Sequence, residues 1–494
     1  MSAPSPGPRS KWSLRAAALG AGAIPALAFP EANWWWLAYA GLVPLLLLIA
    51  EAWHPREGAV RGWLGGTGFL IATHHWLVFK LGPFLPVAAL LVAALWLPWG
   101  WGAQKLLSSR SPRAGLGTAV VLASGWVLIE FMRSWEYLGG PFGLLGSTQW
   151  NVRSLLSPAA LGGVWAVGFL IVWVNVCITL ALRTSGLGGR VIAVAAAAVA
   201  LLVGPVYDAI RSDPEGAGRV TVATVQVGVI GDPDTRVEAG LKATEAVAAR
   251  GADIVLWGES SVGSDFERSP DLLRRVRGVA SEVGADILVN VDALRTRDGG
   301  IYKSAVLVTP AGVAGTYDKI RLVPFGEFIP MRAALGWIAE ITEAADVDRR
   351  RGGELRLLRS DDITLGPLIC FESAFPDMSR RLVDMGADLI VFQSATTTFQ
   401  ETWAPEQHAS LAAVRAMETG RPTVHATLTG VTAAFDARAR GLVRMDTDTV
   451  GTRVFDLPLV RGTTAYVRFG DWVPLAAGVI VLIAVVIASR SRAA

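Results

Sequence analysis

Long apolar runs occupy both ends of the chain, and shorter apolar runs alternate with charged segments in the part between them. Seven long runs precede Ser212 and an eighth closes the chain, and each predicts a membrane-spanning helix. The expected spans are 16–29, 34–50, 59–79, 85–103, 116–131, 161–182, 191–210 and 473–489. Several are shorter than the roughly 20 residues that a perpendicular transmembrane helix needs, so broken or tilted helices are expected among them.

The first apolar run has two interpretations. Arg9, Lys11 and Arg15 precede it and a stretch of small residues at 26–28 ends it, a pattern that also fits a cleavable signal peptide. An uncleaved helix is the preferred interpretation. Cleavage would leave the orientation of the other spans unchanged.

Positive charge predicts how the spans are oriented, because Lys and Arg accumulate in cytoplasmic loops. With eight spans, twelve Lys and Arg residues fall on one side of the membrane. The short loops of the other side hold only Lys80, Arg133 and Arg153. Both termini are therefore expected in the cytoplasm, and residues 212–471 are expected outside.

Composition supports a membrane part joined to a water-soluble part. Of the 494 residues, 52% are hydrophobic and 18% are charged, which excludes intrinsic disorder, a collagen-like fibre and a small disulfide-stapled scaffold. Residues 1–212 hold 15 of the 19 Trp and carry 14 Lys and Arg against 6 Asp and Glu, whereas the remainder carries 31 against 36. The net positive charge of the chain thus comes from the membrane part and does not indicate nucleic-acid binding. The expected domains are a seven-span membrane domain (1–211), an extracytoplasmic domain (212–471), and the eighth span with a cytoplasmic tail (472–494).

The pattern of the middle segment is typical of an α/β domain. β-rich runs are expected to form strands at 219–225, 253–257, 286–291, 304–309, 364–371, 388–393 and 423–428. Amphipathic helices are expected at 235–250, 270–283, 376–385 and 406–419. Strands that are apolar on both faces and alternate with helices predict a sheet covered by helices.

Common site motifs are missing from the sequence. It contains no convincing Gly-rich phosphate loop, metal-spaced His/Cys cluster or Gly-x-Ser-x-Gly elbow, so neither a cofactor nor a metal is expected. The two cysteines are not expected to form a disulfide, because Cys177 lies within the sixth span and Cys370 in the soluble domain. A free thiol in an extracytoplasmic domain is unusual, which makes Cys370 a candidate functional residue.

Three chemically active residues are expected at strand ends, where open sheets place ligands. Glu259 follows Asp-Ile-Val-Leu-Trp-Gly, Lys319 precedes a loop rich in Pro and Gly, and Cys370 ends Leu-Gly-Pro-Leu-Ile-Cys. Each alone has an ordinary interpretation: Glu259 as a helix cap, Lys319 as a solvated surface charge and Cys370 as a small buried residue. Together they are coherent, because a carboxylate can accept the thiol proton, the thiolate can attack a carbonyl carbon, and an ammonium can stabilise the resulting oxyanion.

These three motifs, in this order, resemble the Glu-Lys-Cys site of the nitrilase superfamily. With the membrane part included, nearly the whole chain is similar to the apolipoprotein N-acyltransferase family, a membrane-embedded branch of that superfamily. The most specific match is Lys319-Ile-Arg-Leu-Val-Pro-Phe-Gly-Glu327-Phe-Ile-Pro, and two further matching blocks lie at 125–149 and 405–422. The resemblance implies a polytopic α-helical membrane domain of about eight spans and an extracytoplasmic α/β nitrilase-like αββα sandwich in a bacterial inner or plasma membrane.

The resemblance also implies roles for individual residues. Glu259 would be the general base, Lys319 the oxyanion stabiliser and Cys370 the acylated nucleophile, with Glu327 and Glu372 as supporting residues. This sequence departs from the family pattern in having Gly258 before Glu259 in place of Pro, Phe371 in place of Tyr, and a different stretch at 393–399. These departures are expected at pocket walls or loops, where they would affect substrate preference more than the chemistry.

The resemblance implies transfer of an acyl chain from a membrane phospholipid, through a thioester on Cys370, to the α-amine of a diacylglyceryl-modified apolipoprotein. Two alternatives remain at the level of sequence. One is a membrane-tethered amidase that uses the same three residues on small amides or nitriles. The other is a transporter or receptor with a ligand-binding outer domain, although few ionisable residues lie within the expected spans.

Overall fold

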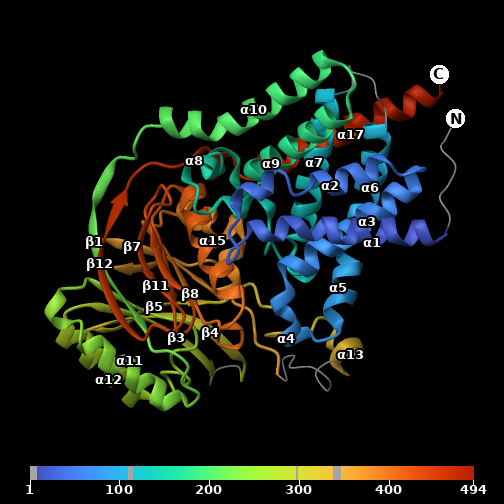
Figure 1. The fold of residues 1–494 in the computed structure, drawn as a ribbon. Coiled ribbons are helices and arrows are strands. Elements are labelled where there is room, and N and C mark those ends of the chain that lie inside the picture. Colours follow the sequence, from blue (N-terminus) through green and yellow to red (C-terminus); the bar gives the residue numbers. More distant parts are fainter. Residues whose placement is uncertain (1–7, 109–114, 296–298, 338–346, 494) are drawn as a thin grey trace. The chain divides into compact units, whose positions relative to one another are not determined.

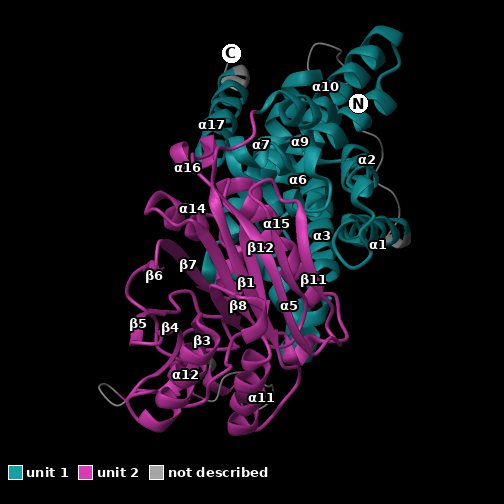
Figure 2. Ribbon diagram, turned by 90° about the vertical axis from the view of Figure 1, so that its left-hand side faces the viewer, with its two compact units in different colours: residues 1–211, 471–494 teal, residues 212–470 magenta. Residues whose placement is uncertain are grey.

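In the computed structural model of the protein, the described residues are 8–108, 115–295, 299–337 and 347–493. The chain divides into two compact units, which Figure 2 colours separately. One consists of residues 1–211 and 471–494, and the other of residues 212–470. Each unit is described by itself below.

Over its described residues, the regular structure of the first unit is helical. Its α-helices are α1 (Pro8–Ala23), α2 (Val43–Ala50), α3 (Pro55–Thr73), α4 (Val78–Leu81), α5 (Phe84–Ala93), α6 (Trp96–Ser108), α7 (Gly115–Arg133), α8 (Arg153–Leu156), α9 (Ala159–Arg183), α10 (Leu187–Ile210) and α17 (Trp472–Ala493). Large aromatic side chains pack at its centre. The ring of Trp126 lies 5.3 Å from that of Trp96 and 5.4 Å from that of Trp99, both edge-to-face, which is a favoured geometry for aromatic pairs.

Four helices within the described residues are long and apolar enough to cross a membrane: α7, α9, α10 and residues Trp472–Arg490 of α17. A fifth span results if α5 and α6, which meet at a bend of 51°, are counted together. The other three expected spans correspond to shorter or more polar helices. α1 ends at Ala23, α2 has eight residues, and α3 contains Arg56, Glu57 and Arg61. Eight spans therefore remain a prediction.

The second unit is built on two six-stranded sheets. The first sheet has the order β12 (Gly451–Val460), β1 (Gly216–Gln226), β2 (Ile254–Trp257), β3 (Asp286–Leu294), β4 (Ile301–Thr309) and β5 (Gly312–Asp318). The second has the order β11 (Gly441–Met445), β10 (Thr432–Phe435), β9 (Thr423–Thr427), β8 (Leu389–Ser394), β7 (Ile363–Ile369) and β6 (Leu358–Ser360). In each sheet a parallel core of three strands is extended by antiparallel strands at the edges.

Helices cover the outer face of each sheet, so the unit is a four-layer αββα sandwich (Figure 1). Helices α11 (Pro233–Glu245) and α12 (Pro270–Val283) pack on the first sheet, and α14 (Pro376–Asp384) and α15 (Ala404–Thr419) pack on the second. Two short helices, α13 (Arg332–Leu335) and α16 (Ala465–Phe469), complete the unit. The core strands β2, β8 and β9 are buried along their whole length. The apolar sequences of β2 and of residues 389–392 in β8 predict this burial.

The expected elements of this domain all have counterparts, and the αββα sandwich that the resemblance implied is confirmed, with two sheets. The pattern of apolar and polar residues by itself predicted only a sheet covered by helices, and it did not identify β5, β6, β10, β11 or β12 as strands. The missed strands are all antiparallel and lie toward the sheet edges, where polar and Gly residues are tolerated on the exposed face. The strand expected at 364–371 ends at Ile369, because the backbone turns at Cys370.

Candidate active site

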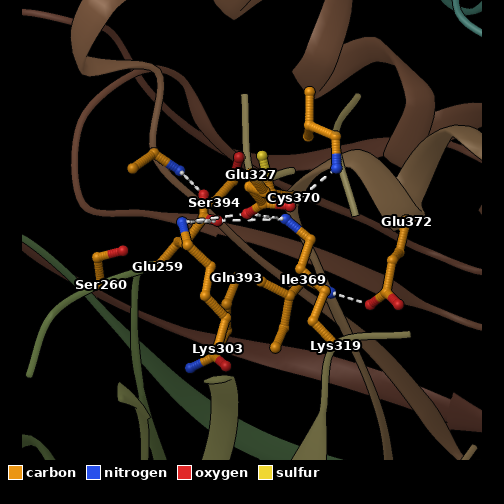
Figure 3. Close-up of polar contacts among 12 residues, drawn as sticks. Glu259, Ser260, Lys303, Lys319, Glu327, Ile369, Cys370, Glu372, Gln393 and Ser394 are labelled. Atoms are coloured by element: carbon orange, nitrogen blue, oxygen red, sulfur yellow. Dashed lines mark hydrogen bonds and ion pairs between the residues drawn. The ribbon is translucent and has the colours of Figure 1, made fainter. Parts of the chain in front are cut away.

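The three residues expected at strand ends do come together in one buried site (Figure 3). Glu259 follows β2 and Lys319 follows β5 in the first sheet, and Cys370 follows β7 in the second. The side chain of Lys319 is fully buried and its Nζ lies 3.5 Å from Glu259 Oε1. The thiol of Cys370 is influenced electrostatically by both residues. The αββα sandwich thus brings together a carboxylate, an ammonium and a thiol that come from two different sheets.

Lys319 is held mainly by Glu327. Its Nζ donates a hydrogen bond of 2.8 Å to Glu327 Oε1, while Glu327 Oε2 accepts one of 2.9 Å from the backbone N–H of Val323. Burial alone would lower the pKa of Lys319, but Glu327 and Glu259 outweigh burial and hold that pKa above its ordinary value. Lys319 is therefore a permanent cation in the site.

A second lysine, which the sequence analysis missed, reaches the same carboxylates. Lys303 on β4 donates a hydrogen bond of 2.7 Å to Glu259 Oε1, and its Nζ lies 3.4 Å from Glu327 Oε1. Figure 3 shows both lysine side chains directed at these two carboxylates. One signal could have found Lys303: side chains alternate along a strand, and Lys303 shares a face with the buried Ala305 and Leu307.

Glu259 is held at both of its oxygens. Besides the lysine contacts at Oε1, its Oε2 accepts a hydrogen bond of 3.2 Å from the backbone N–H of Ala395, and its own N–H donates to Ser394 O at 3.1 Å. Burial alone would raise the pKa of Glu259, but Lys303 and Lys319 outweigh burial and hold that pKa below its ordinary value. Glu259 is thus an ionised, fixed carboxylate that can accept a proton.

Cys370 occupies a turn with unusual backbone geometry. Its φ is +52°, a left-handed conformation that is uncommon for a residue other than glycine and that often marks a functional position. Burial, followed by the charge of Glu259, raises the pKa of the Cys370 thiol to about 12, against the opposing effect of the two lysines. The Cys370 side chain is therefore a neutral thiol at neutral pH, and it would have to lose its proton to act as a nucleophile.

His408 on α15 supports the turn of Cys370, a role that the sequence did not reveal. Its Nε2 donates to the backbone carbonyl of Cys370 at 3.0 Å, and its Nδ1 lies 3.0 Å from the hydroxyl of Ser394. Burial lowers the pKa of His408, so the imidazole is neutral at neutral pH. A neutral ring can accept from Ser394 while it donates to Cys370, which fixes its tautomer.

Glu372 lies within the same turn but points away from the reacting groups. Its carboxylate accepts hydrogen bonds from the Tyr317 hydroxyl and from the backbone N–H groups of Ile320, Arg321 and Ile369, at 2.8 to 3.0 Å. Burial raises the pKa of Glu372. The side chain therefore ties the segment after β5, which carries Lys319, to the turn after β7.

Comparisons with known proteins identify the family of the chain. The family model of the apolipoprotein N-acyltransferase N-terminal domain matches residues 21–177. The carbon-nitrogen hydrolase model matches residues 221–465, which contain both sheets except for the start of β1. The chain is 30% identical over 477 residues to an apolipoprotein N-acyltransferase of Geobacter metallireducens, which covers 91% of this chain and 90% of that relative. The chain belongs to the apolipoprotein N-acyltransferase family.

Other similar proteins extend this comparison. An apolipoprotein N-acyltransferase of Caulobacter vibrioides is 31% identical over 529 residues, covering 97% of this chain and 95% of the relative. Among solved structures, the Caenorhabditis elegans NitFhit protein is 18% identical with a TM-score of 0.40, covering 52% of this chain and 63% of that one. The soluble unit of this apolipoprotein N-acyltransferase family member has the nitrilase-like fold with two sheets.

The structure accounts for two departures from the family pattern. A Cβ on Gly258 would lie 1.8 Å from the backbone N of Leu428, so only glycine fits between β2 and β9 at this point. Gln393 was expected at a pocket wall or loop, and this expectation is wrong. Gln393 lies in β8 and is fully buried between the sheets, where its Nε2 donates to Trp257 O at 2.9 Å and to Leu288 O at 3.2 Å.

Proposed function

We propose that the chain is an apolipoprotein N-acyltransferase whose reaction proceeds through a thioester on Cys370. It moves a fatty acyl chain from a membrane phospholipid to the α-amine of an S-diacylglyceryl-cysteine at the N-terminus of a lipoprotein. The observation that carries this proposal is the convergence of Glu259, Lys319 and Cys370 in one buried site within a chain that belongs to this family.

In the first half-reaction, Cys370 attacks the ester carbonyl carbon of the phospholipid. Glu259 accepts the thiol proton as the S–C bond forms, which avoids an isolated thiolate in a site that disfavours it. Lys319 stabilises the oxyanion, a contribution of roughly 3–4 kcal/mol for one preorganised donor. The ester C–O bond then breaks, Glu259 returns the proton to the leaving alkoxide, and a lysophospholipid departs.

In the second half-reaction, the unprotonated α-amine of the lipoprotein attacks the thioester carbonyl. Glu259 accepts a proton from the nitrogen, the C–S bond breaks, and the Cys370 sulfur regains a proton. The product is an amide, which is more stable than the ester and the thioester that precede it. The overall transfer from ester to amide therefore runs downhill in free energy, and the thioester between them is the more reactive intermediate.

The membrane part supplies the setting for both substrates, since each carries acyl chains that stay in the bilayer. The proposal includes eight spans, both termini in the cytoplasm and the catalytic unit on the extracytoplasmic side of the bacterial inner or plasma membrane. The asymmetry of Lys and Arg between the loops supports this orientation.

The experiment uses the full-length protein in detergent with a phospholipid that carries a labelled acyl chain. We expect label on the protein that neutral hydroxylamine releases, that is absent in Cys370→Ala, and that passes to the amine of an added diacylglyceryl-cysteine peptide. If label forms on the protein but is lost only to water, the chain is a hydrolase and the proposed acyl transfer is wrong. Equal labelling of the Cys370→Ala variant would rule out the proposed nucleophile.

A further inference from the structure

Two lysines, rather than one, contact the carboxylates of the candidate active site, and they differ in their surroundings. Lys319 is fully buried and its shortest contact is with Glu327, at 2.8 Å. Lys303 retains 12% exposure of its side chain and its shortest contact is with Glu259, at 2.7 Å. Because Lys319 lies 3.5 Å from Glu259, the closer cationic partner of Glu259 is Lys303.

The sheet itself fixes the position of Lys303. In the antiparallel pair of β3 and β4, Lys303 lies directly opposite Asp292, and their charged groups approach to 3.6 Å. Asp292 in turn accepts hydrogen bonds from Arg349 at 3.1 and 3.2 Å and from the Ser260 hydroxyl at 3.2 Å. The ammonium of Lys303 is thus held from one side by Asp292 and from the other by the site carboxylates.

The charges of this cluster balance only when Lys303 is included. Its three carboxylates are those of Glu259, Asp292 and Glu327, and its three cations are those of Lys303, Lys319 and Arg349. Removing Lys303 leaves three buried or partly buried carboxylates facing two cations. An uncompensated carboxylate in such a site binds a proton more readily.

We propose that Lys303 is a positioning residue that keeps Glu259 ionised and oriented for proton transfer, while Lys319 is left to stabilise the oxyanion. This inference rests on the proposed role of Glu259 as the general base. Lys303 and Ala395 hold the two carboxylate oxygens of Glu259 from different elements, so the carboxylate has little freedom to rotate. The division of labour explains why the site contains two lysines.

Several charged or titratable groups besides Lys303 act on the ionisation of Glu259. Among the described residues, these are Lys319 and Glu327 after β5, Arg349 before β6, Cys370 after β7 and His408 on α15. Asp292 on β3 faces Lys303 itself. Lys303 is the second-largest influence on the pKa of Glu259, after burial, and it lowers that pKa. Its loss therefore raises the pKa of the base, which must be deprotonated to act.

The test measures the single-turnover rate of acyl-enzyme formation against pH in full-length Lys303→Met, Lys303→Arg and the parent. The acidic limb of Lys303→Met should move to higher pH, with the rate falling about tenfold per pH unit below it and recovering above it. Lys303→Arg keeps the positive charge, so the acidic limb of its pH profile should stay where it is in the parent. The exposed Lys242→Met on α11 is the matched control and should behave as the parent.

A second readout works without any acyl donor. In a Cys177→Ala background Cys370 is the sole thiol, and at pH values where Glu259 stays ionised Lys303→Met should slow its alkylation by iodoacetamide, since Lys303 lowers the pKa of this thiol. If Lys303→Met instead lowers the rate of acyl-enzyme formation equally at every pH and leaves the acidic limb of that profile unmoved, the proposed role of Lys303 is overturned. Absence of a Cys370-dependent thioester in the parent would instead overturn the proposed function, and the alkylation rates would still report on Lys303.

Discussion

The Tyr317 hydroxyl donates a hydrogen bond of 2.8 Å to the carboxylate of Glu372. Tyr317 lies at the end of β5, two residues before Lys319, and Glu372 lies two residues after Cys370. This contact crosses between the two sheets, because β5 and β7 belong to different ones. It therefore helps to set the separation of the Lys319 ammonium from the Cys370 thiol.

Glu372→Gln should reduce both stability and activity, although Glu372 contacts no reacting group. An amide in place of the carboxylate turns an NH₂ toward backbone N–H groups, and an unsatisfied buried polar group costs about 1–3 kcal/mol. Tyr317→Phe leaves the three backbone hydrogen bonds of Glu372 in place and should cost about 1 kcal/mol. Thermal unfolding and thioester formation measure the two effects. Equal losses in both variants would contradict this ranking.

Gly258→Ala should displace Glu259 and lower the rate of thioester formation. The added Cβ would meet the backbone of Thr427 and Leu428, which cannot move as a flexible side chain can. Overpacking of this kind costs about 1–3 kcal/mol. Gly278→Ala on α12 is the matched control, because its Cβ would meet no atom within 4 Å and alanine favours a helix. A fully active Gly258→Ala variant would show that β2 and β9 can separate.

Alkylation of Cys370 should remain slow at neutral pH and rise as the medium becomes more alkaline. Burial holds the pKa of the thiol at about 12, so the reactive thiolate is a minor species below that pH and increases about tenfold per pH unit. Iodoacetamide kinetics between pH 6 and 10 in the Cys177→Ala background provide the measurement. A plateau near pH 7 would mean that the thiolate is already the resting form.

His408→Ala should slow acyl-enzyme formation by about tenfold, the cost of losing one positioning hydrogen bond of about 1.4 kcal/mol. The variant loses the donor to the Cys370 carbonyl and so loosens a turn with a left-handed backbone. Because the imidazole is neutral at neutral pH, the pH profile between 6 and 9 should keep its shape. A limb near pH 6.5 in the parent that vanishes in the variant would instead identify His408 as an acid or base.

The sequence alone was sufficient for the α/β character of the soluble unit and for its core elements. Strand β2 and residues 389–392 of β8 are continuous apolar runs, and such runs reflect local burial. The same logic identified Glu259, Lys319 and Cys370 as strand-end residues with a coherent joint chemistry, and family resemblance then assigned each its proposed role. The number and orientation of the membrane spans stay predictions.

Only the tertiary structure decided which charges meet in the site. Lys303 lies in the middle of a strand, 44 residues from Glu259, and their contact depends on the register of β3 with β4 and on the order of strands in the sheet. The need for glycine at position 258 likewise comes from the close backbone of Leu428, which follows a strand of the other sheet. Local patterns in a sequence report burial and periodicity, whereas long-range contacts arise from packing, which no single segment encodes.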